Sequence, residues 1–267
     1  MSDFDIREIE AGITETQFTG TVLHLRSVGS TNTIALEAAQ AGATTGVWIA
    51  DEQTAGRGRG GHSWHSAAGD GLYVSVLVTP RLPMRLALWI SLATGMAVKD
   101  AVTKTTGVSA DIRWPNDLLV NGKKFGGILV ETAVAPGDAG GTEAALRYAV
   151  IGIGLNLNHR KFPEEIANVA TSLYLAGGAH VRREPLLVEL LRSLDRELNL
   201  LEVKGGSGLL ERFTAASSWV QGKRVRVEEA GGYEGVTAGL DAHGFLQVDG
   251  NDGVRRTVLS GGVRELS

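Results

Sequence analysis

The chain has 267 residues, 43% of them hydrophobic, and a formal net charge of -4 at pH 7. This length suits one large domain, or a large domain with a small one, and the apolar content suffices for a sizeable core. The negative charge argues against general binding to nucleic acid or anionic membranes. The chain has no cysteine, which excludes disulfides, thiolate metal sites and a cysteine nucleophile and favours a reducing cytoplasm.

Residues 1–20 show no clear periodicity and lack the basic and apolar regions of a signal peptide. No apolar run is expected to span a bilayer, because Lys99 and Asp100 interrupt the longest one. Residues 21–25 alternate weakly and predict a strand. Residues 30–32 (STN) then precede a helical pattern, which is typical of an N-cap. A helix N-terminus also binds carboxylate or phosphate, so a ligand contact is the alternative role.

The most unusual segment is residues 56–64 (GRGRGGHSW), between strands predicted at 47–50 and 72–78. It matches the glycine spacing of a dinucleotide-binding loop, but that motif should open a helix, which this sequence disfavours. Glycines allow close backbone approach to a ligand, and arginines offer forked donors to phosphate or carboxylate. The indole of Trp64 offers an apolar wall. The segment therefore predicts a site for an anionic ligand with an apolar body.

A long helix is predicted over residues 84–105 and a strand over 108–114. Residues 113–117 (RWPND) end that strand, because proline cannot serve inside a central strand. An ordinary turn and a functional turn both remain open for this motif. Residues 118–131 predict a hairpin on an Asn-Gly turn, with Lys124 at the start of the returning strand and paired glycines beside it.

The C-terminal half of the chain predicts a strand, then helices, and from about residue 220 only strands. Residues 135–141 predict a flexible turn, and 146–153 predict a strand that ends in further glycines and two amides. From about residue 220, short alternating strands with glycine turns predict a small appended barrel. Helices are predicted at 170–176, 184–202 and 208–218.

Five motifs occur in an order that resembles the biotin protein ligase family. They are 30–32 (STN), Gln53 with 56–59 (GRGR), 113–117 (RWPND), 124–129 (KFGGIL) and 152–156 (GIGLN). The resemblance covers nearly the whole chain, and it is the order of all five that makes it specific. It implies an α+β fold with a mixed, largely antiparallel sheet and helices, as in class II aminoacyl-tRNA synthetases, plus a C-terminal SH3-like small β-barrel. It places the catalytic domain at 1–219 and the barrel at 220–267.

The same resemblance implies an ATP-dependent, AMP-forming biotin ligase. Such an enzyme joins biotin and ATP, with Mg²⁺, into biotinyl-5′-AMP and releases pyrophosphate. It then transfers biotin to one lysine of the biotin carboxyl carrier domain of an acyl-CoA carboxylase. No enzyme nucleophile is needed for this chemistry, whereas charge neutralisation at the phosphates is. We expect a cytoplasmic monomer or weak homodimer without membrane attachment.

The resemblance also assigns roles to single residues. Lys124 would bridge the biotin carboxylate and the α-phosphate, and Asn156 would face the ATP ribose or base. Asp117 would support Mg²⁺, and the loop 56–64 would close over biotin and the adenylate. The expected catalytic set is Arg57, Arg59, Arg113 and Lys124. The expected biotin-binding set is Ser30, Thr31, Asn32, Gln53, Gly56, Arg57, Gly58, Arg59, Trp64, Lys124, Gly126 and Gly127. The expected nucleotide-binding set is Arg57, Arg59, Trp64, Arg113, Asn116, Asp117, Lys124 and Asn156.

Two positions depart from the family pattern. Arg113 stands where the family most often has lysine, and His62 stands where it commonly has arginine. The alternatives are a lipoate ligase of the same fold, a biotin-sensing DNA-binding regulator and an inactive binding module. The glycine–arginine loop and the C-terminal barrel favour biotin. Few residues precede the first motif, so we expect no sequence-specific DNA binding.

Overall fold

The computed structural model describes residues 4–134, 144–229 and 231–266. Its centre is a seven-stranded sheet with the strand order β1-β2-β3-β7-β6-β5-β4. Strands β1 and β2 pair in parallel, and the other neighbours pair antiparallel. This confirms the expected mixed, largely antiparallel sheet. Its strands are β1 (Val22–Val28), β2 (Gly46–Gln53), β3 (Gly71–Val78), β4 (Asp111–Arg113), β5 (Asp117–Val120), β6 (Lys123–Val134) and β7 (Leu146–Asn156).

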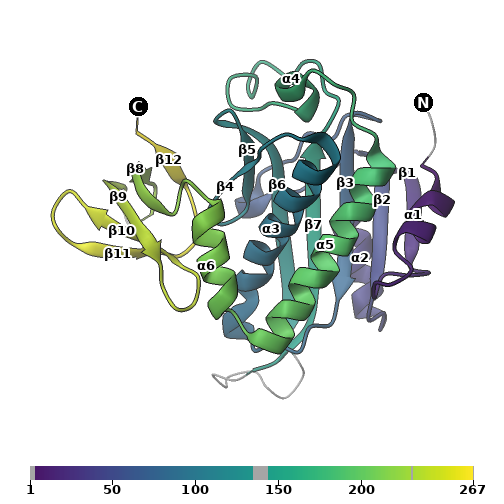
Figure 1. Cartoon of the computed structure of the whole chain (residues 1–267), viewed down its shortest axis with the longest axis horizontal. Coiled ribbons are helices and arrows are strands. Elements are labelled where there is room, and N and C mark those ends of the chain that lie inside the picture. The colour runs from purple at the N-terminus through teal and green to yellow at the C-terminus, as the bar shows by residue number, and fades with distance from the viewer. Residues whose placement is uncertain (1–3, 135–143, 230, 267) are drawn as a thin grey trace.

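Helices cover both faces of this sheet (Figure 1). Helices α3 (Ala87–Thr106) and α5 (Arg183–Lys204) lie on one face, and α2 (Thr31–Gln40) lies on the other. Successive strand residues point to opposite faces, so Val76 joins the large core while its neighbour Leu77 joins the smaller cluster beneath α2. Every residue of β3 is buried for this reason.

The remaining helices are short, and one of them, η2 (Met84–Leu86), directly precedes α3. Helix α1 (Ile6–Gly12) was not predicted, because seven residues carry little periodic signal; Asp5 caps it by accepting from two backbone N–H groups. The others are α4 (Leu173–Gly177), α6 (Ser207–Ala216), η1 (Arg59–Gly61) and η2 (Met84–Leu86). By length and composition alone, the segment Met84–Thr106 could cross a membrane, although the sequence predicted no run long enough. However, 67% of its most apolar 18-residue stretch is buried inside the protein, as in a core helix.

The local turn signals were read correctly, and the ends of strands less so. Strands β5 and β6 form the expected hairpin, in which Asn121 and Gly122 both take positive φ, at 51° and 75°. The strand expected at 108–114 is shorter, because α3 extends to Thr106 and residues 107–110 form its connection to β4. The turn expected at 135–141 lies outside the described residues.

A second sheet follows the last helix (Figure 1). It is antiparallel with the strand order β11-β10-β9-β8-β12. The link 217–220 joins α6 to β8 and contains the boundary expected between residues 219 and 220. That the two parts are separate domains stays a prediction. The strands are β8 (Gln221–Val227), β9 (Tyr233–Leu240), β10 (Leu246–Gly250), β11 (Arg255–Val258) and β12 (Val263–Glu265).

Two tryptophans of the larger part hold one turn of the second sheet. The indole N–H of Trp89 donates to the carbonyl of His243 at 2.7 Å, and that of Trp114 donates to the carbonyl of Gly244 at 2.9 Å. Both indoles are buried, so each bond satisfies a donor that would otherwise be lost from water. These bonds fix the second sheet beside the β4–β5 turn.

The ammonium of Lys99 connects α3 with two neighbouring segments, and its contribution to stability can be tested. Its Nζ donates to the carbonyls of Ala110 and Ala216, at 2.6 and 2.8 Å, and so ties α3 to the end of α6. Lys99→Met should lower the free energy of unfolding by about 2 kcal/mol, because two charge-assisted bonds are lost. The matched control is Lys104→Met on the same helix, whose ammonium pairs with Asp100 and Glu189 at the surface. It should cost less than about 1 kcal/mol. Equal losses in urea titrations would contradict this role of Lys99.

Candidate active site

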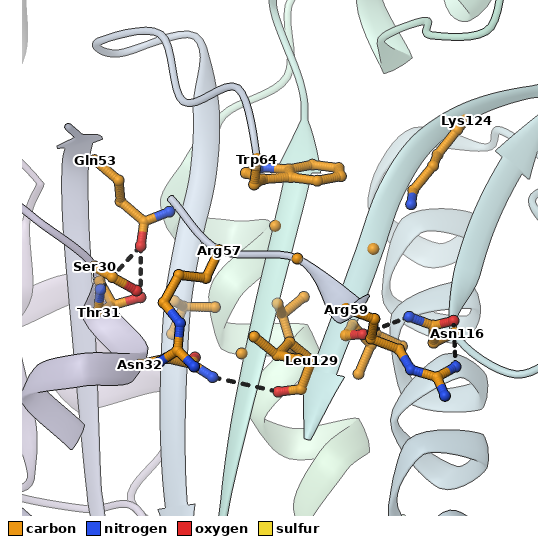
Figure 2. A pocket seen from close by; sticks show the side chains of 17 residues that line it. Ser30, Thr31, Asn32, Gln53, Arg57, Arg59, Trp64, Asn116, Lys124 and Leu129 are labelled. Carbon is orange, nitrogen blue, oxygen red and sulfur yellow. Dashed lines mark hydrogen bonds between the residues drawn. The ribbon is translucent and has the colours of Figure 1, made fainter. Parts of the chain in front are cut away.

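A narrow cavity of about 50 Å³ lies at the N-terminal end of α2, beneath the loop between β2 and β3. The residues that surround it come from the start of α2, the end of β2, this loop, the β4–β5 turn and strands β3, β6 and β7 (Figure 2). Most of the expected biotin-binding set lines it. The lining is Ser30, Thr31, Asn32, Gln53, Arg57, Gly58, Arg59, Trp64, Val74, Asn116, Lys124, Gly127, Ile128, Leu129, Gly152, Ile153 and Gly154.

Glycines clear the sheet surface that forms the floor of this cavity. A Cβ at Gly152 would lie 2.1 Å from Oδ1 of Asn32, and a Cβ at Gly154 would lie 2.6 Å from Nε1 of Trp64. Gly154 pairs with Gly127 on β6, where a Cβ would lie 3.2 Å from the Trp64 ring. Any larger residue at 152 or 154 would therefore displace a cavity side chain.

One side of the cavity is a polar chain that starts at the loop. Arg57 Nη2 lies 2.6 Å from Oε1 of Glu131, and the Asn32 amide donates to Oε2 of the same carboxylate at 2.9 Å. The hydroxyl of Ser75 lies 2.5 Å from Oδ1 of Asn32. Figure 2 shows Arg57 pointing inward from the loop toward Asn32. Glu131 therefore orients one cation and one amide at this end of the cavity.

The same chain continues across the start of α2 to the far end of the loop. Thr31 donates through its N–H and its hydroxyl to Oε1 of Gln53, at 2.9 and 3.1 Å. The Gln53 amide then donates to the hydroxyl of Ser66 at 3.1 Å. Ser30 occupies the N-cap position but makes no side-chain cap hydrogen bond. The sequence left a cap and a ligand contact open for Ser30, and its hydroxyl lines the cavity without capping the helix.

The loop over the cavity is held by its own backbone. Gly58 N–H donates to the carbonyl of His62 at 2.7 Å, and Trp64 N–H donates to that of Gly56 at 2.8 Å. Gly60 takes a positive φ of 62° inside this turn, which favours glycine there. The bonds place the Trp64 ring over the cavity, with the Lys124 ammonium 5.4 Å from its centre (Figure 2).

A half-buried carboxylate holds two cations beside the cavity. Asp117 Oδ1 lies 2.5 Å from Lys124 Nζ, while Oδ2 accepts from Nε and Nη2 of Arg113 at 3.1 and 2.5 Å. Burial alone would raise the pKa of Asp117, but the charges of Lys124 and Arg113 outweigh it and lower that pKa. Asp117 is therefore ionised at neutral pH.

A larger cavity of about 560 Å³ begins on the other side of these charges. Arg59, Trp64, Asn116 and Lys124 line both cavities, and Ser260 with its neighbours lines the larger one from the second sheet. Arg59 Nη1 donates to Oδ1 of Asn116 at 3.2 Å. The cations thus lie where a ligand in the narrow cavity would meet a ligand in the larger one.

Three expected contact residues lie outside the lining of both cavities. A Cβ at Gly56 would lie 2.5 Å from the Trp64 carbonyl, and one at Gly126 would lie 2.6 Å from Leu155, so these glycines serve packing. Asn156 is buried, and its amide donates to the carbonyl of Thr171 at 3.1 Å. Arg113, Asp117 and His62 line only the larger cavity.

Sequence reasoning missed the residues that support the site from the strands. Glu131 and Ser75 were not singled out, and Gly152 and Gly154 were noted without a role. A signal for Glu131 existed, because it lies four residues after Gly127 in the same strand, and alternate strand residues share one sheet face. A charged residue on that face of an otherwise apolar strand is expected to pair with a group of opposite charge.

Comparison with known proteins agrees with this geometry. Residues 25–156 match the model of the biotin/lipoate A/B protein ligase family, and residues 221–263 match that of the biotin protein ligase C-terminal domain. The biotin–[acetyl-CoA-carboxylase] ligase of Mycobacterium tuberculosis is 36% identical over 242 residues, which cover 88% of this chain and 84% of that protein. The bifunctional ligase/repressor BirA of Bacillus subtilis is 32% identical over 86% of this chain and 69% of that protein.

The fold agrees as well. A structure of the biotin protein ligase from Aquifex aeolicus in complex with biotin and ATP superposes with a TM-score of 0.77 and 27% identity. The match covers 92% of this chain and 100% of that one. Sequence and fold together show that this chain belongs to the biotin protein ligase family.

Proposed function

We propose that this protein activates biotin with ATP and transfers it to a lysine of a biotin carboxyl carrier domain. The observation that carries the proposal is the arrangement of the two cavities. A narrow cavity with a polar end opens toward Lys124 and Arg59, and a larger cavity begins at these same cations. This suits a small carboxylic acid that must meet a nucleotide phosphate.

We place biotin in the narrow cavity with its ureido ring at the polar end. Ser30, Thr31, Asn32 and Gln53 offer donors and acceptors there, and the glycine floor with Trp64 offers flat apolar walls. The valerate chain would then lead toward Lys124. The Lys124 ammonium lies 2.5 Å from Oδ1 of Asp117. It can bind a second anion while it keeps this ion pair.

The first step needs charge neutralisation rather than a nucleophile from the enzyme. A biotin carboxylate oxygen attacks the α-phosphorus of ATP, the bond to the bridging oxygen breaks, and pyrophosphate leaves with that electron pair. Lys124 and Arg59 border both ligands, so they can stabilise charge that develops between them. Arg113 borders only the nucleotide side and Asn116 borders both cavities, while Arg57 is held by Glu131 on the biotin side.

The second step uses the acceptor lysine as nucleophile. Its neutral amine attacks the carbonyl carbon of biotinyl-5′-AMP, forms the amide, loses a proton and expels AMP. The loop 56–64 with Trp64 would exclude water from this mixed anhydride. A carrier domain of acetyl-CoA carboxylase suits the names of the curated relatives.

Asp117 does not fit the expected role of Mg²⁺ ligand. Both of its carboxylate oxygens already face cations, and no cluster of three potential ligand residues occurs among the described residues. Mg²⁺ commonly binds nucleotide phosphates with few protein ligands. We therefore propose it only as a companion of ATP and derive no step through it.

The competing functions receive less support. A lipoate ligase would share the match over residues 25–156, but the C-terminal match is to a biotin protein ligase domain. Four expectations stay predictions: the absence of sequence-specific DNA binding, a monomeric or weakly dimeric state, the absence of membrane attachment, and a cytoplasmic location.

The decisive test of function is exchange of labelled pyrophosphate into ATP. Exchange should require biotin, because the reverse of the first step regenerates ATP only when biotinyl-5′-AMP forms. Lipoate at the same concentration is the matched competitor. Exchange that proceeds equally without biotin, or faster with lipoate, would refute the proposal.

Lys124→Ala should slow adenylate formation roughly a hundredfold or more, since the ammonium stabilises charge between two anions in a site with little water. Lys123→Ala is the control, because Lys123 is the sequence neighbour of Lys124 and its side chain is exposed. Single-turnover formation of biotinyl-5′-AMP measures both. A similar small loss in the two variants would reduce Lys124 to a surface charge.

Gly154→Ala should weaken biotin binding about tenfold, because the added methyl would displace the Trp64 ring. Gly208→Ala, in α6, is the control, since a Cβ there meets nothing within 4 Å. Isothermal calorimetry with biotin gives both dissociation constants. Unchanged affinity in Gly154→Ala would show that Trp64 does not close the cavity.

A further inference from the structure

The segment between β11 and β12 forms part of the wall of the larger cavity. Ser260, Gly261 and Gly262 line it, and the two glycines take positive φ values of 102° and 75°. A Cβ at Gly261 would lie 3.5 Å from Pro115 and 3.6 Å from Nη1 of Arg59. The second sheet therefore reaches the active site through this glycine turn, where a side chain at position 261 would come close to Arg59.

The carboxylate of Glu229 holds this turn, and Glu229 itself also lines the larger cavity. Its Oε2 accepts from the N–H of Leu259 at 3.0 Å, and Oε1 accepts from the N–H and the hydroxyl of Ser260, both at 2.5 Å. Burial alone would raise the pKa of Glu229, but these bonds and one from the Gly261 backbone lower it. An ionised carboxylate thus fixes a turn that lies 30 residues away in sequence.

Glu229 also acts on Arg59 by charge. Burial lowers the pKa of the Arg59 guanidinium, and the negative charges of Asp117 and Glu229 oppose this shift. Asn116 accepts one bond from the same guanidinium. Arg59 is therefore bonded to Asn116 in the larger part of the chain and lies within the field of Glu229 in the smaller part. Glu229 lines the larger cavity but not the narrow one.

We propose that Glu229 is a positioning residue for adenylate formation, which fixes the turn 259–262 and through it the guanidinium of Arg59 on the nucleotide side. This inference rests on the proposed function in one respect, namely that the larger cavity receives ATP. It sets Glu229 apart from a residue that merely stabilises the second sheet, because a stabilising role would not favour one substrate over the other.

The test varies ATP and biotin separately in pyrophosphate exchange. Glu229→Gln keeps the size of the side chain but replaces one acceptor oxygen with a donor. The KM for ATP should rise about tenfold, because bonds to a charged acceptor are lost. The KM for biotin should change less than about twofold, and the melting temperature should stay within a few degrees of that of the wild type.

Two further variants make the result specific. Ser260→Ala removes the partner hydroxyl and should raise the KM for ATP in the same direction. The double variant should be less impaired than the two single effects combined, since both act on one contact. The matched control is Asp252→Asn, whose carboxylate likewise braces a turn of the second sheet through Val254 N–H and Arg256. It lines neither cavity and should leave both KM values unchanged.

The outcomes separate the inference from the proposed function. An unchanged KM for ATP in Glu229→Gln, an equal rise in both KM values, or the same effect in Asp252→Asn would overturn the positioning role. If the wild type shows no biotin-dependent exchange, the proposed function fails instead. Calorimetric binding of ATP to the same variants then decides the role of Glu229, and an unchanged affinity in Glu229→Gln overturns it. If Glu229→Gln does not fold, Ser260→Ala serves the same comparison.

Discussion

The site depends on the half-buried carboxylate of Asp117, which keeps two cations in place. An isolated charge at the position of Asp117 would be costly to bury, and Lys124 and Arg113 without it would repel each other. Together the three groups leave one net positive charge at the border of the two cavities. The β5–β6 hairpin supplies Asp117 and Lys124 from paired strands, so backbone geometry sets this arrangement before any ligand binds. Such fixed charges need little reorganisation during a reaction.

A steric constraint complements this electrostatic one. Ligand rings can lie close to a sheet only where side chains are missing, and Gly127 and Gly154 are register partners on β6 and β7. Gly152 extends the cleared surface toward α2, where it makes room for Asn32. Glycine weakens a strand because it costs conformational entropy and packs nothing. Burial of the opposite face under α3 and α5 offsets that weakness, since Ile151 and Ile153 are almost fully buried there.

Local signals made much of the fold predictable. The hairpin was readable from Asn121-Gly122, and the helices at 84–105 and 184–202 from their apolar periodicity. The family motifs also indicated Lys124 and Arg59, but they did not say which residues would share a cavity. Glu131 was missed because its partner Arg57 lies 74 residues away, and such an ion pair leaves no local pattern. The inward turn of the Asn156 amide depends on Thr171, which only the tertiary structure brings beside it.

The arginine at position 113 follows from the same geometry. Its guanidinium donates two bonds to Asp117 through Nε and Nη2, while its centre lies 5.3 Å from the ring centre of Trp219. A planar ion can use its edge and its face together, whereas the compact ammonium of lysine offers neither a fork nor a face. Trp219 is buried in the link 217–220 that joins α6 to the second sheet. The link is thereby connected through Arg113 to Asp117, and through Asp117 to Lys124. A shift of the second sheet that moved Trp219 would change the partners of Asp117, so the position of that sheet bears on the charge that faces the substrates.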